Sequence, residues 1–407
     1  MAQSTARRLR IAYVYRDFNR NGSLASFFVD RAERLSRDED VTAVCSGRTR
    51  AATDAPVRFE PVEPLVRGDG RLSYAVECAS FALRAKRALR RLRDQTDVVH
   101  VVGYAAPEAD LVTVNAVRPA ELAHYFGQIE SDARLRRRLG PALRPQSLVV
   151  QAVERRLFRP PFPLCLPETK AIADDLRRYY DVPADAIEVL PAGVDVHRFQ
   201  HDPRARAETR RRYGVRHERL VVLFVGDEFE RKGLDRAIAG VAQARLDAEL
   251  WVAGGGPVAP YARRGASLGL GERIRFLGRV PLEELPALYA ACDVLLLPSR
   301  QDAWGQPVLE ALAGGRVALA SEYTGAHEVL EHGVNGFVLE REGPPEQIAA
   351  LLDGPLADPE TRAAIGCRAV AAVAAFDRDV LYQRLREAHH KAHARRLSRL
   401  GQAPPQA

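Results

Sequence analysis

Short apolar runs that alternate with amphipathic segments are the feature that most constrains how this chain folds. In the second half, each run is followed by a loop with glycine or proline, and most of these loops lead into a helical pattern. The runs span residues 220–225, 250–253, 274–277, 294–297 and 317–320. Continuously apolar strands are buried on both faces, as in a parallel sheet that helices cover on both sides. The alternation therefore predicts a doubly wound α/β domain.

The first half shows the same pattern with less regularity. Its predicted elements are a strand over 9–15, a helix over about 24–36, a strand over 41–45, a basic helix over about 73–93, a strand over 98–102 and a strand–helix pair over about 164–180. The first three make a βαβ unit, whose two strands lie parallel in one sheet. We therefore expect a Rossmann-like domain here as well.

The length of the chain indicates two domains. With 407 residues it exceeds what a single hydrophobic core usually supports. We expect a first domain over 1–190, a second over 191–375, a helix over 376–400 that packs back on the first domain, and a disordered tail over 401–407. Two facing Rossmann-like domains with parallel sheets leave an interdomain cleft at the carboxyl ends of their strands, where ligands bind.

The excess of basic residues indicates which kinds of partner this protein binds. The formal charge is +7, and arginine-rich segments lie over about 84–93 and 133–159. Such charge favours a partner with phosphates or an anionic surface. No nucleic-acid-binding motif accompanies it, so we expect no nucleic-acid partner. An anionic membrane surface is one interpretation, and an arginine-rich composition without a binding role is the other.

Cysteine spacing and hydropathy indicate the compartment. The five cysteines are odd in number and form no C-x-x-C pair, which favours a reducing cytoplasm and argues against a zinc site. No run approaches the roughly 20 apolar residues of a membrane span. We expect a cytoplasmic protein, soluble or peripheral on the inner face of the cell membrane.

The segment over 298–315 carries the most chemical information. A buried strand leads into a loop, and a helix begins near Gly305 with Pro307 two residues later, where a missing N–H costs little. The backbone N–H groups of Gly305, Gln306 and Val308 are then free to face an anion, and the helix dipole adds a favourable field. A diphosphate fits such a position.

Acidic side chains flank this helix start. Asp302 lies in the loop before the helix, and Glu310 lies on the inner side of the helix. Glu310 is suited to accept hydrogen bonds from ribose hydroxyls, and Asp302 to hold hydroxyls of a sugar. Spacing alone establishes neither role.

Two adjacent cations lie after an earlier strand. Arg231 and Lys232 follow the predicted strand 220–225, in a loop at its carboxyl end. Such a pair is suited to neutralise a diphosphate and the charge that grows on it as a bond to it breaks. The alternative is a solvated pair at a helix start, but cations are disfavoured there because the helix dipole is positive at that end.

These segments resemble the E-x7-E signature and neighbouring motifs of the retaining GT-B glycosyltransferases of family 4. The resemblance covers nearly all of the second domain: VLPAGVDVHRF, VLFVGDEFERKGLD, LWVAGGGP, RIRFLGRVP and LYAACDVLLLPSRQDAWGQPVLEALAGG. The subgroup that looks most similar is the lipopolysaccharide core glucosyltransferases, which also carry an arginine directly before the lysine.

The resemblance implies a function in cell-envelope polysaccharide or lipopolysaccharide biosynthesis. It implies transfer of a sugar, with retention at the anomeric carbon, from a nucleotide-diphosphate sugar such as a UDP-hexose in the second domain to a glycan or lipid-linked acceptor in the first. No cofactor and no metal are required. The catalytic residues would be Arg231, Lys232 and Asp302. Donor binding would add Gly22, Gly226, Gly305, Gln306, Val308 and Glu310.

Three positions depart from the family pattern. The first acid of the signature is Asp302 in place of glutamate, and Asp227 stands where many members have an arginine. Asn115 stands where many members carry a histidine at the end of a first-domain strand. On the acceptor side, Asn115 and the nearby His124 are therefore the candidates, and His100 is a further histidine that could instead be a satisfied core residue.

Two other functions remain as alternatives at this point. One is a sugar phosphorylase or nucleotide-sugar epimerase on the same fold, although the few lysines show no attachment motif for pyridoxal phosphate. The other is a non-catalytic basic protein that binds RNA or lipid. The second alternative leaves unexplained why Arg231, Lys232, Asp302 and Glu310 occur together.

Overall fold

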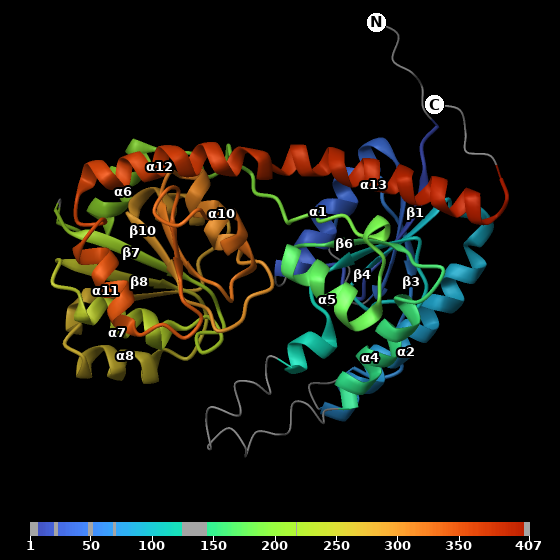
Figure 1. Ribbon diagram of the computed structural model, residues 1–407, viewed down its shortest axis with the longest axis horizontal. Coiled ribbons are helices and arrows are strands. Elements are labelled where there is room, and N and C mark those ends of the chain that lie inside the picture. The colour runs from blue at the N-terminus through green and yellow to red at the C-terminus, as the bar shows by residue number, and fades with distance from the viewer. Residues whose placement is uncertain are drawn as a thin grey trace, which may run out of the picture. The chain divides into compact units, whose positions relative to one another are not determined.

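The computed structural model describes residues 7–19, 23–47, 52–67, 71–123, 145–216 and 218–402 (Figure 1). These residues form two compact units. The first runs to Leu190 and continues from Tyr382 onward, and the second spans Pro191–Leu381. The longest helix, α13 (Arg378–Arg399), therefore begins in the second unit and continues in the first.

The first unit is built on one six-stranded parallel sheet. Its strands are β1 (Arg10–Val14), β2 (Asp40–Cys45), β3 (Arg58–Pro61), β4 (Val98–Val102), β5 (Leu111–Val114) and β6 (Leu164–Pro167). They lie in the order β3-β2-β1-β4-β5-β6. The order runs outward from β1 in one direction and from β4 in the other, as in a doubly wound Rossmann sheet.

Helices cover the first sheet and close its core. They are α1 (Ser23–Asp38), α2 (Arg71–Arg91), α4 (Pro145–Leu157), α5 (Lys170–Tyr180) and the later part of α13. Phe81 of α2 packs with Val14 and Val101 of the strands, and Leu176 of α5 packs with Val112. Burying such side chains contributes about 1.5–3 kcal/mol each, so these contacts fix where the helices lie on the sheet.

The second unit repeats the plan. Its strands are β7 (Leu220–Val225), β8 (Ala248–Ala253), β9 (Ile274–Gly278), β10 (Val294–Leu297), β11 (Val317–Ser321) and β12 (Phe337–Leu339). All pairings are parallel, and the order is β12-β11-β10-β7-β8-β9. The predicted GT-B fold class, with two Rossmann-like units and parallel sheets, is thus confirmed.

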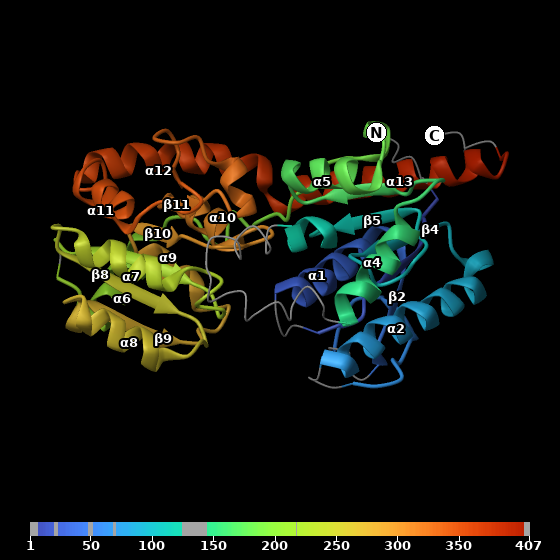
Figure 2. The same cartoon turned by 60° about the horizontal axis from the view of Figure 1, so that its bottom comes forward.

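Helices lie on both faces of the second sheet (Figures 1 and 2). They are α6 (Pro203–Arg212), α7 (Leu234–Gln243), α8 (Val258–Ser267), α9 (Leu285–Ala291), α10 (Gln306–Ala313), α11 (Pro345–Asp353) and α12 (Pro359–Val373). Ile238 of α7 and Ile348 of α11 pack on Val222 and Leu296, while α10 packs against α12 and α6 against α9. The central strands are covered on both sides, which explains their continuously apolar sequences.

Two of the elements that the sequence did not predict are short strands at sheet edges. Strand β3 has only exposed or half-buried residues, and β12 has three residues. An edge strand faces its sheet from one side only, so a buried apolar run does not mark it. No described helix has an apolar stretch long enough to cross a membrane.

Candidate functional site

The carboxyl edge of the second sheet gathers most of the predicted residues. Strands β7 and β10 are neighbours, and the strand order changes direction between them. The loop after β7 carries Gly226, Arg231 and Lys232, and the loop after β10 carries Asp302 and Gly305. Ligands of doubly wound sheets bind where the strand order reverses, so the two loops lie at the expected place for a site.

Lys232 and Asp302 form an ion pair across these loops. The Lys232 ammonium contacts Asp302 Oδ2, and both side chains are nearly buried. Arg231 lies farther from the same carboxylate, with its nearest nitrogen 3.9 Å from Asp302 Oδ1. Arg231 also donates to Glu228 Oε2 and to the Gln301 carbonyl (2.7 Å each). Both cations therefore have carboxylate partners, and both lie close to the Asp302 carboxylate.

Gly233 allows the two loops to approach closely. Its φ is +74°, and a Cβ atom there would lie 2.1 Å from the Pro298 carbonyl oxygen. A backbone hydrogen bond from Arg300 N to Arg231 O (2.9 Å) joins the same loops. Only glycine combines this left-handed conformation with such a short approach. The packing of backbone on backbone thus brings Lys232 to Asp302.

Helix α10 begins at Gly305, which is in the left-handed region with φ +89°. Within the described part of the chain, the backbone N–H groups of Gly305 and Gln306 have no acceptor. The prediction for Val308 is wrong: its N–H donates to the Gly305 carbonyl (2.9 Å), because the first turn closes an i to i−3 bond. Two amides, rather than three, are available to an anion at this helix start. The Gln306 side chain donates to the Gly193 carbonyl (3.1 Å).

Glu310 lies on α10 with its carboxylate held by a tyrosine. The Tyr289 hydroxyl donates to Glu310 Oε2 at 2.6 Å. Burial raises the pKa of Glu310, while the Tyr289 hydrogen bond and the charge of Arg198 lower it, and the net shift is upward. The second carboxylate oxygen, Oε1, can accept a further hydrogen bond. The arrangement suits a group that receives a hydroxyl donor.

Several residues at this edge were not predicted. Arg300 forms a bidentate pair with Asp235 in the first turn of α7, at 2.8 and 2.7 Å. Asp227 accepts from the Gly255 N–H (2.7 Å), so the loop after β7 is tied to the loop after β8. Buried Thr324 pairs in a backbone bridge with Asp302. Arg300 lies two residues before Asp302 in the sequence, so its position next to a predicted site residue could have marked it as a candidate.

In the first unit, the structure describes two of the candidate residues, Asn115 and His100. Asn115 follows β5 and donates to Glu168 Oε1 at 3.4 Å. Gly22 and His124 lie outside the described residues. Gly226 directly follows β7 in the second unit, and a Cβ atom there would be 3.0 Å from Lys232 Cγ. Among the described residues, no three His, Cys, Asp or Glu side chains gather closely enough to hold a metal ion.

His100 is a core residue of the first unit. It is fully buried, with Nδ1 3.0 Å from His389 Nε2 and Nε2 2.9 Å from Thr113 Oγ1. His389 Nδ1 faces the Leu385 carbonyl (2.8 Å), which can only accept. His389 Nδ1 therefore carries the proton, His100 Nδ1 donates to His389 Nε2, and Thr113 donates to His100. The alternative of a satisfied core histidine is the one that the geometry supports.

Two family models match the chain. The family described as Glycosyltransferase Family 4 matches residues 25–198, and that described as Glycosyl transferases group 1 matches residues 205–370. The crystal structure of WaaG, a glycosyltransferase involved in lipopolysaccharide biosynthesis, aligns with 93% of this chain and 99% of its own. The TM-score is 0.74 at 20% identity, a likeness of fold.

Curated relatives match at higher identity over part of their length. The chain is 38% identical over 195 residues to the GDP-mannose-dependent alpha-(1-6)-phosphatidylinositol monomannoside mannosyltransferase of Mycolicibacterium smegmatis, covering 45% of this chain and 50% of the relative. It is 33% identical over 216 residues to the D-inositol 3-phosphate glycosyltransferase of Corynebacterium glutamicum, covering 50% and 51%. The chain thus spans about half the length of the curated relatives that it matches.

These names do not confirm the lipopolysaccharide subgroup, because both relatives are named for inositol-containing compounds. The family itself is supported from both halves of the chain and from the fold. The two Rossmann-like units are each matched by one of these family models, and their fold is that of the GT-B glycosyltransferases.

Proposed function

We propose that this protein transfers a hexosyl group from a nucleoside-diphosphate hexose to a hydroxyl of a glycolipid, glycan or phosphorylated polyol, with retention at the anomeric carbon. The observation that carries the proposal is the convergence of Arg231, Lys232, Asp302 and the start of α10 at the switch point of the second sheet. Cations and unpaired amides there suit a diphosphate, and the acids suit hydroxyl groups.

The reaction breaks the bond between the anomeric carbon and the diphosphate oxygen and forms one to the acceptor oxygen. The acceptor proton passes to the departing diphosphate, on the same face of the sugar. Negative charge grows on the leaving group, and Arg231, Lys232 and the amides of Gly305 and Gln306 would stabilise it. Asp302 would hold sugar hydroxyls while it keeps Lys232 in place.

In this proposal Glu310 binds the ribose of the donor. Its carboxylate already accepts the Tyr289 hydroxyl through Oε2, which orients the other oxygen. Asp302 has a side chain one methylene shorter than the glutamate of the family signature. Its tie to Lys232 and to the backbone of Thr324 offsets the shorter reach by fixing the carboxylate position.

The identity of the donor has two candidates with different support. The names of the curated relatives favour GDP-mannose, and the motif resemblance favours a UDP-hexose acting in lipopolysaccharide or other envelope biosynthesis. We propose GDP-mannose as the first donor to test, since the relatives named for it match at higher identity than the solved structures. The acceptor classes to pair with it are inositol phosphate and phosphatidylinositol mannosides.

The experiment is to measure release of the nucleoside diphosphate with GDP-mannose and UDP-glucose, each with and without those acceptors. We expect acceptor-dependent release with one donor, and an α-linked product from an α-linked donor by NMR. Lys232→Met and Asp302→Asn should abolish release, whereas Arg245→Met, an exposed position of the same unit, should not. A product of inverted configuration would contradict retention, and an absorbance band of pyridoxal phosphate would favour a phosphorylase.

A peripheral location at the inner face of the membrane is part of the proposal. Helices α2 and α4 carry basic residues, yet Lys86 and Arg156 both pair with Glu108, and Arg91 pairs with Glu60. Exposed Arg87 and Arg90 remain to face headgroups. We expect the protein to sediment with vesicles that contain phosphatidylglycerol and not with phosphatidylcholine alone. Equal sedimentation with both would contradict electrostatic attachment.

A further inference from the structure

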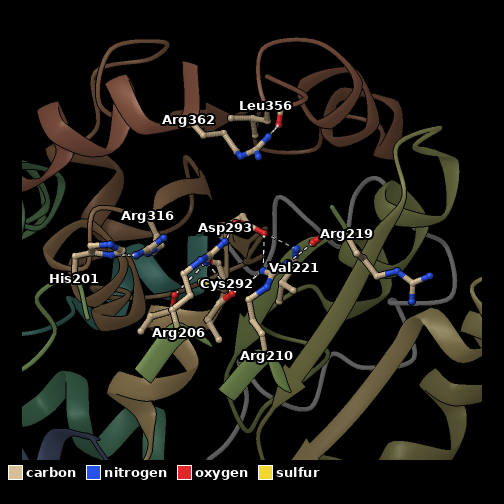
Figure 3. Close-up of polar contacts among 12 residues, drawn as sticks. His201, Arg206, Arg210, Arg219, Val221, Cys292, Asp293, Arg316, Leu356 and Arg362 are labelled. Atoms are coloured by element: carbon tan, nitrogen blue, oxygen red, sulfur yellow. Dashed lines mark hydrogen bonds and ion pairs between the residues drawn. The ribbon is translucent and has the colours of Figure 1, made fainter. Parts of the chain in front are cut away.

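A second group of cations lies at the opposite edge of the second sheet (Figure 3). Asp293 directly precedes β10, and Arg316 directly precedes β11, so both lie at the amino ends of their strands. Helix α6 contributes Arg206 and Arg210, and α12 contributes Arg362. We call these four arginines, with Asp293 and the neighbouring His201, the arginine cluster.

Asp293 is the acid that pairs with two of the arginines. Its carboxylate accepts from Arg206 at 2.6 Å, from Arg210 at 3.2 Å and from the Val221 N–H at 2.8 Å. Burial acts to raise the pKa of Asp293, but Arg206, the amide and Arg210 outweigh it, so the pKa is lowered. The Asp293 carboxylate thus pairs directly with two of the four guanidinium groups, those of Arg206 and Arg210.

Backbone carbonyls satisfy three of the arginines. Arg206 donates to the carbonyls of Ala291 and Cys292, at 3.0 and 2.9 Å, at the end of α9. Arg210 donates to the Ala291 carbonyl (3.0 Å). Arg362 donates to the Ala357 carbonyl (3.0 Å). These bonds satisfy carbonyl groups at the ends of helices and in loops. Carbonyl dipoles, however, do not neutralise the positive charge of the guanidinium groups.

Arg316 differs from the other three. Its residue is 9% exposed, and its Nε has no hydrogen-bond partner among the described residues. Its terminal nitrogen contacts His201 Nδ1, a ring nitrogen without negative charge. In the described part of the chain no carboxylate lies within 4.0 Å of it. Because a guanidinium keeps its proton, Arg316 is a buried charge with no directly paired carboxylate among the described residues and only the more distant charge of Asp293, an arrangement that an added anion would stabilise.

Two nearby acids outside the cluster make their hydrogen bonds to other groups, although the charge of Asp358 also acts on Arg362. Asp202 accepts from the N–H groups of Arg204 and Ala205, and Asp358 accepts from Thr361. The contact with Arg316 leaves the proton of His201 on Nε2, because Nδ1 must accept. His201 is exposed, so the cluster reaches the surface there.

We propose that the arginine cluster binds a phosphate group, with Arg316 as the main ligand, at the amino edge of the second sheet. A phosphate supplies the missing negative charge and several acceptor oxygens, which match the two-pronged donor geometry of guanidinium groups. Helix α10 separates this edge from the carboxyl edge: it begins at Gly305 and ends before Arg316. The inference does not depend on the proposed transfer reaction.

The test uses the full chain with inorganic phosphate at constant ionic strength, chloride replacing phosphate in the reference. We expect the melting temperature to rise by roughly 5 °C at phosphate about 100 times above its Kd. Arg316→Met should lose the rise and Arg245→Met should keep it. Hydrogen–deuterium exchange should show protection over 201–212 and 314–318. Protection over 201–212 and 314–318 without protection over 228–233 would show that phosphate binds at this site and not at the proposed donor site.

A second arm distinguishes a free phosphate from a lipid headgroup. Vesicles of phosphatidylcholine with phosphatidic acid carry the same phosphate chemistry at a surface. Sedimentation that Arg316→Met abolishes, without a response to free phosphate, would assign the site to a headgroup. If Arg316→Met does not fold, Arg362→Met tests the same cluster from α12. Phosphate and vesicle responses that neither substitution changes would overturn the proposal.

Discussion

The ammonium group of Lys232 and the carboxylate of Asp302 form an ion pair with side chains only 12% and 10% exposed. The pair joins the loop after β7 to the loop after β10, seventy positions apart in the chain. Nearly buried ion pairs lose much more than exposed ones when one partner is removed, because the other charge stays without compensation. This pair is therefore central both to the site and to the stability of the loops.

The first prediction concerns the coupling of these two residues. Lys232→Met and Asp302→Asn should each lower the unfolding free energy by about 2–4 kcal/mol, and the double variant by less than the sum. In the proposed transfer reaction both should lower kcat/KM at least about 100-fold. Denaturant unfolding and product release measure the two effects. Glu228→Gln, which removes the exposed partner of Arg231, is the control and should cost under about 1 kcal/mol. Additive losses would show that the pair is not coupled.

The second prediction concerns the start of α10. Gly305→Ala should destabilise the second unit by more than about 2 kcal/mol, because Ala must adopt φ +89° and its Cβ would lie 2.2 Å from Thr324 Cγ2. Gly333→Ala is the matched control: φ is +77°, and an added Cβ meets no described atom within 4 Å. It should show the conformational cost alone, about 1–2 kcal/mol.

Thr324→Ser provides the complementary test of this contact. Serine keeps the hydroxyl that faces Ser321 and removes the Cγ2 methyl group. The combination of Gly305→Ala with Thr324→Ser should therefore recover the steric part of the loss and leave the conformational part. Denaturant unfolding of the four proteins gives both values. No recovery would mean that the left-handed conformation accounts for the entire effect.

The third prediction concerns the hydroxyl that holds Glu310. Tyr289→Phe removes the 2.6 Å hydrogen bond and should raise the pKa of Glu310 further, because burial is then less opposed. If Glu310 binds the donor ribose, KM for the donor should rise roughly tenfold with kcat little changed, since the bond is not made to the reacting atoms. Tyr382→Phe removes a similar bond, to Asp38 at 2.7 Å in the first unit, and should leave KM unchanged.

The fourth prediction concerns pH and the buried histidine pair. Burial lowers the pKa of His389 to about 3, and burial with the nearby His389 and Arg31 lowers that of His100 far below its usual value. The unfolded chain therefore binds more protons than the folded first unit below pH 6.5. Stability from these histidines is present above pH 6.5 and is lost as pH falls, by about 1.4 kcal/mol per pH unit for each.

The variant His389→Gln tests this assignment. It should be less stable than the wild type at pH 7.5 but should lose less between pH 6.5 and pH 5, because one titrating group is gone. Denaturant unfolding at several pH values measures the difference. His390→Gln, at a half-exposed position next along α13, is the matched substitution outside the buried pair. A parallel profile for His389→Gln would contradict the role of the buried pair.

Apolar periodicity predicted the central strands of both sheets, because those strands are buried on both faces and their sequence alone records it. Strands β7 and β10 lie where the sequence placed them, as does the start of α10 after Gly305. The motifs likewise predicted one site that contains Arg231, Lys232, Asp302 and Glu310.

The tertiary structure alone decided how these residues pair. The sequence does not show that Gly233 lets the backbone of one loop approach Pro298 of another, which joins Lys232 to Asp302. Nor does it show that the Val308 amide donates to the Gly305 carbonyl, or that Arg316 Nε is buried without a hydrogen-bond partner among the described residues. A sequence records local periodicity and residue chemistry, whereas partners distant in the chain are set by packing, through the order of the strands and the close approach of their loops.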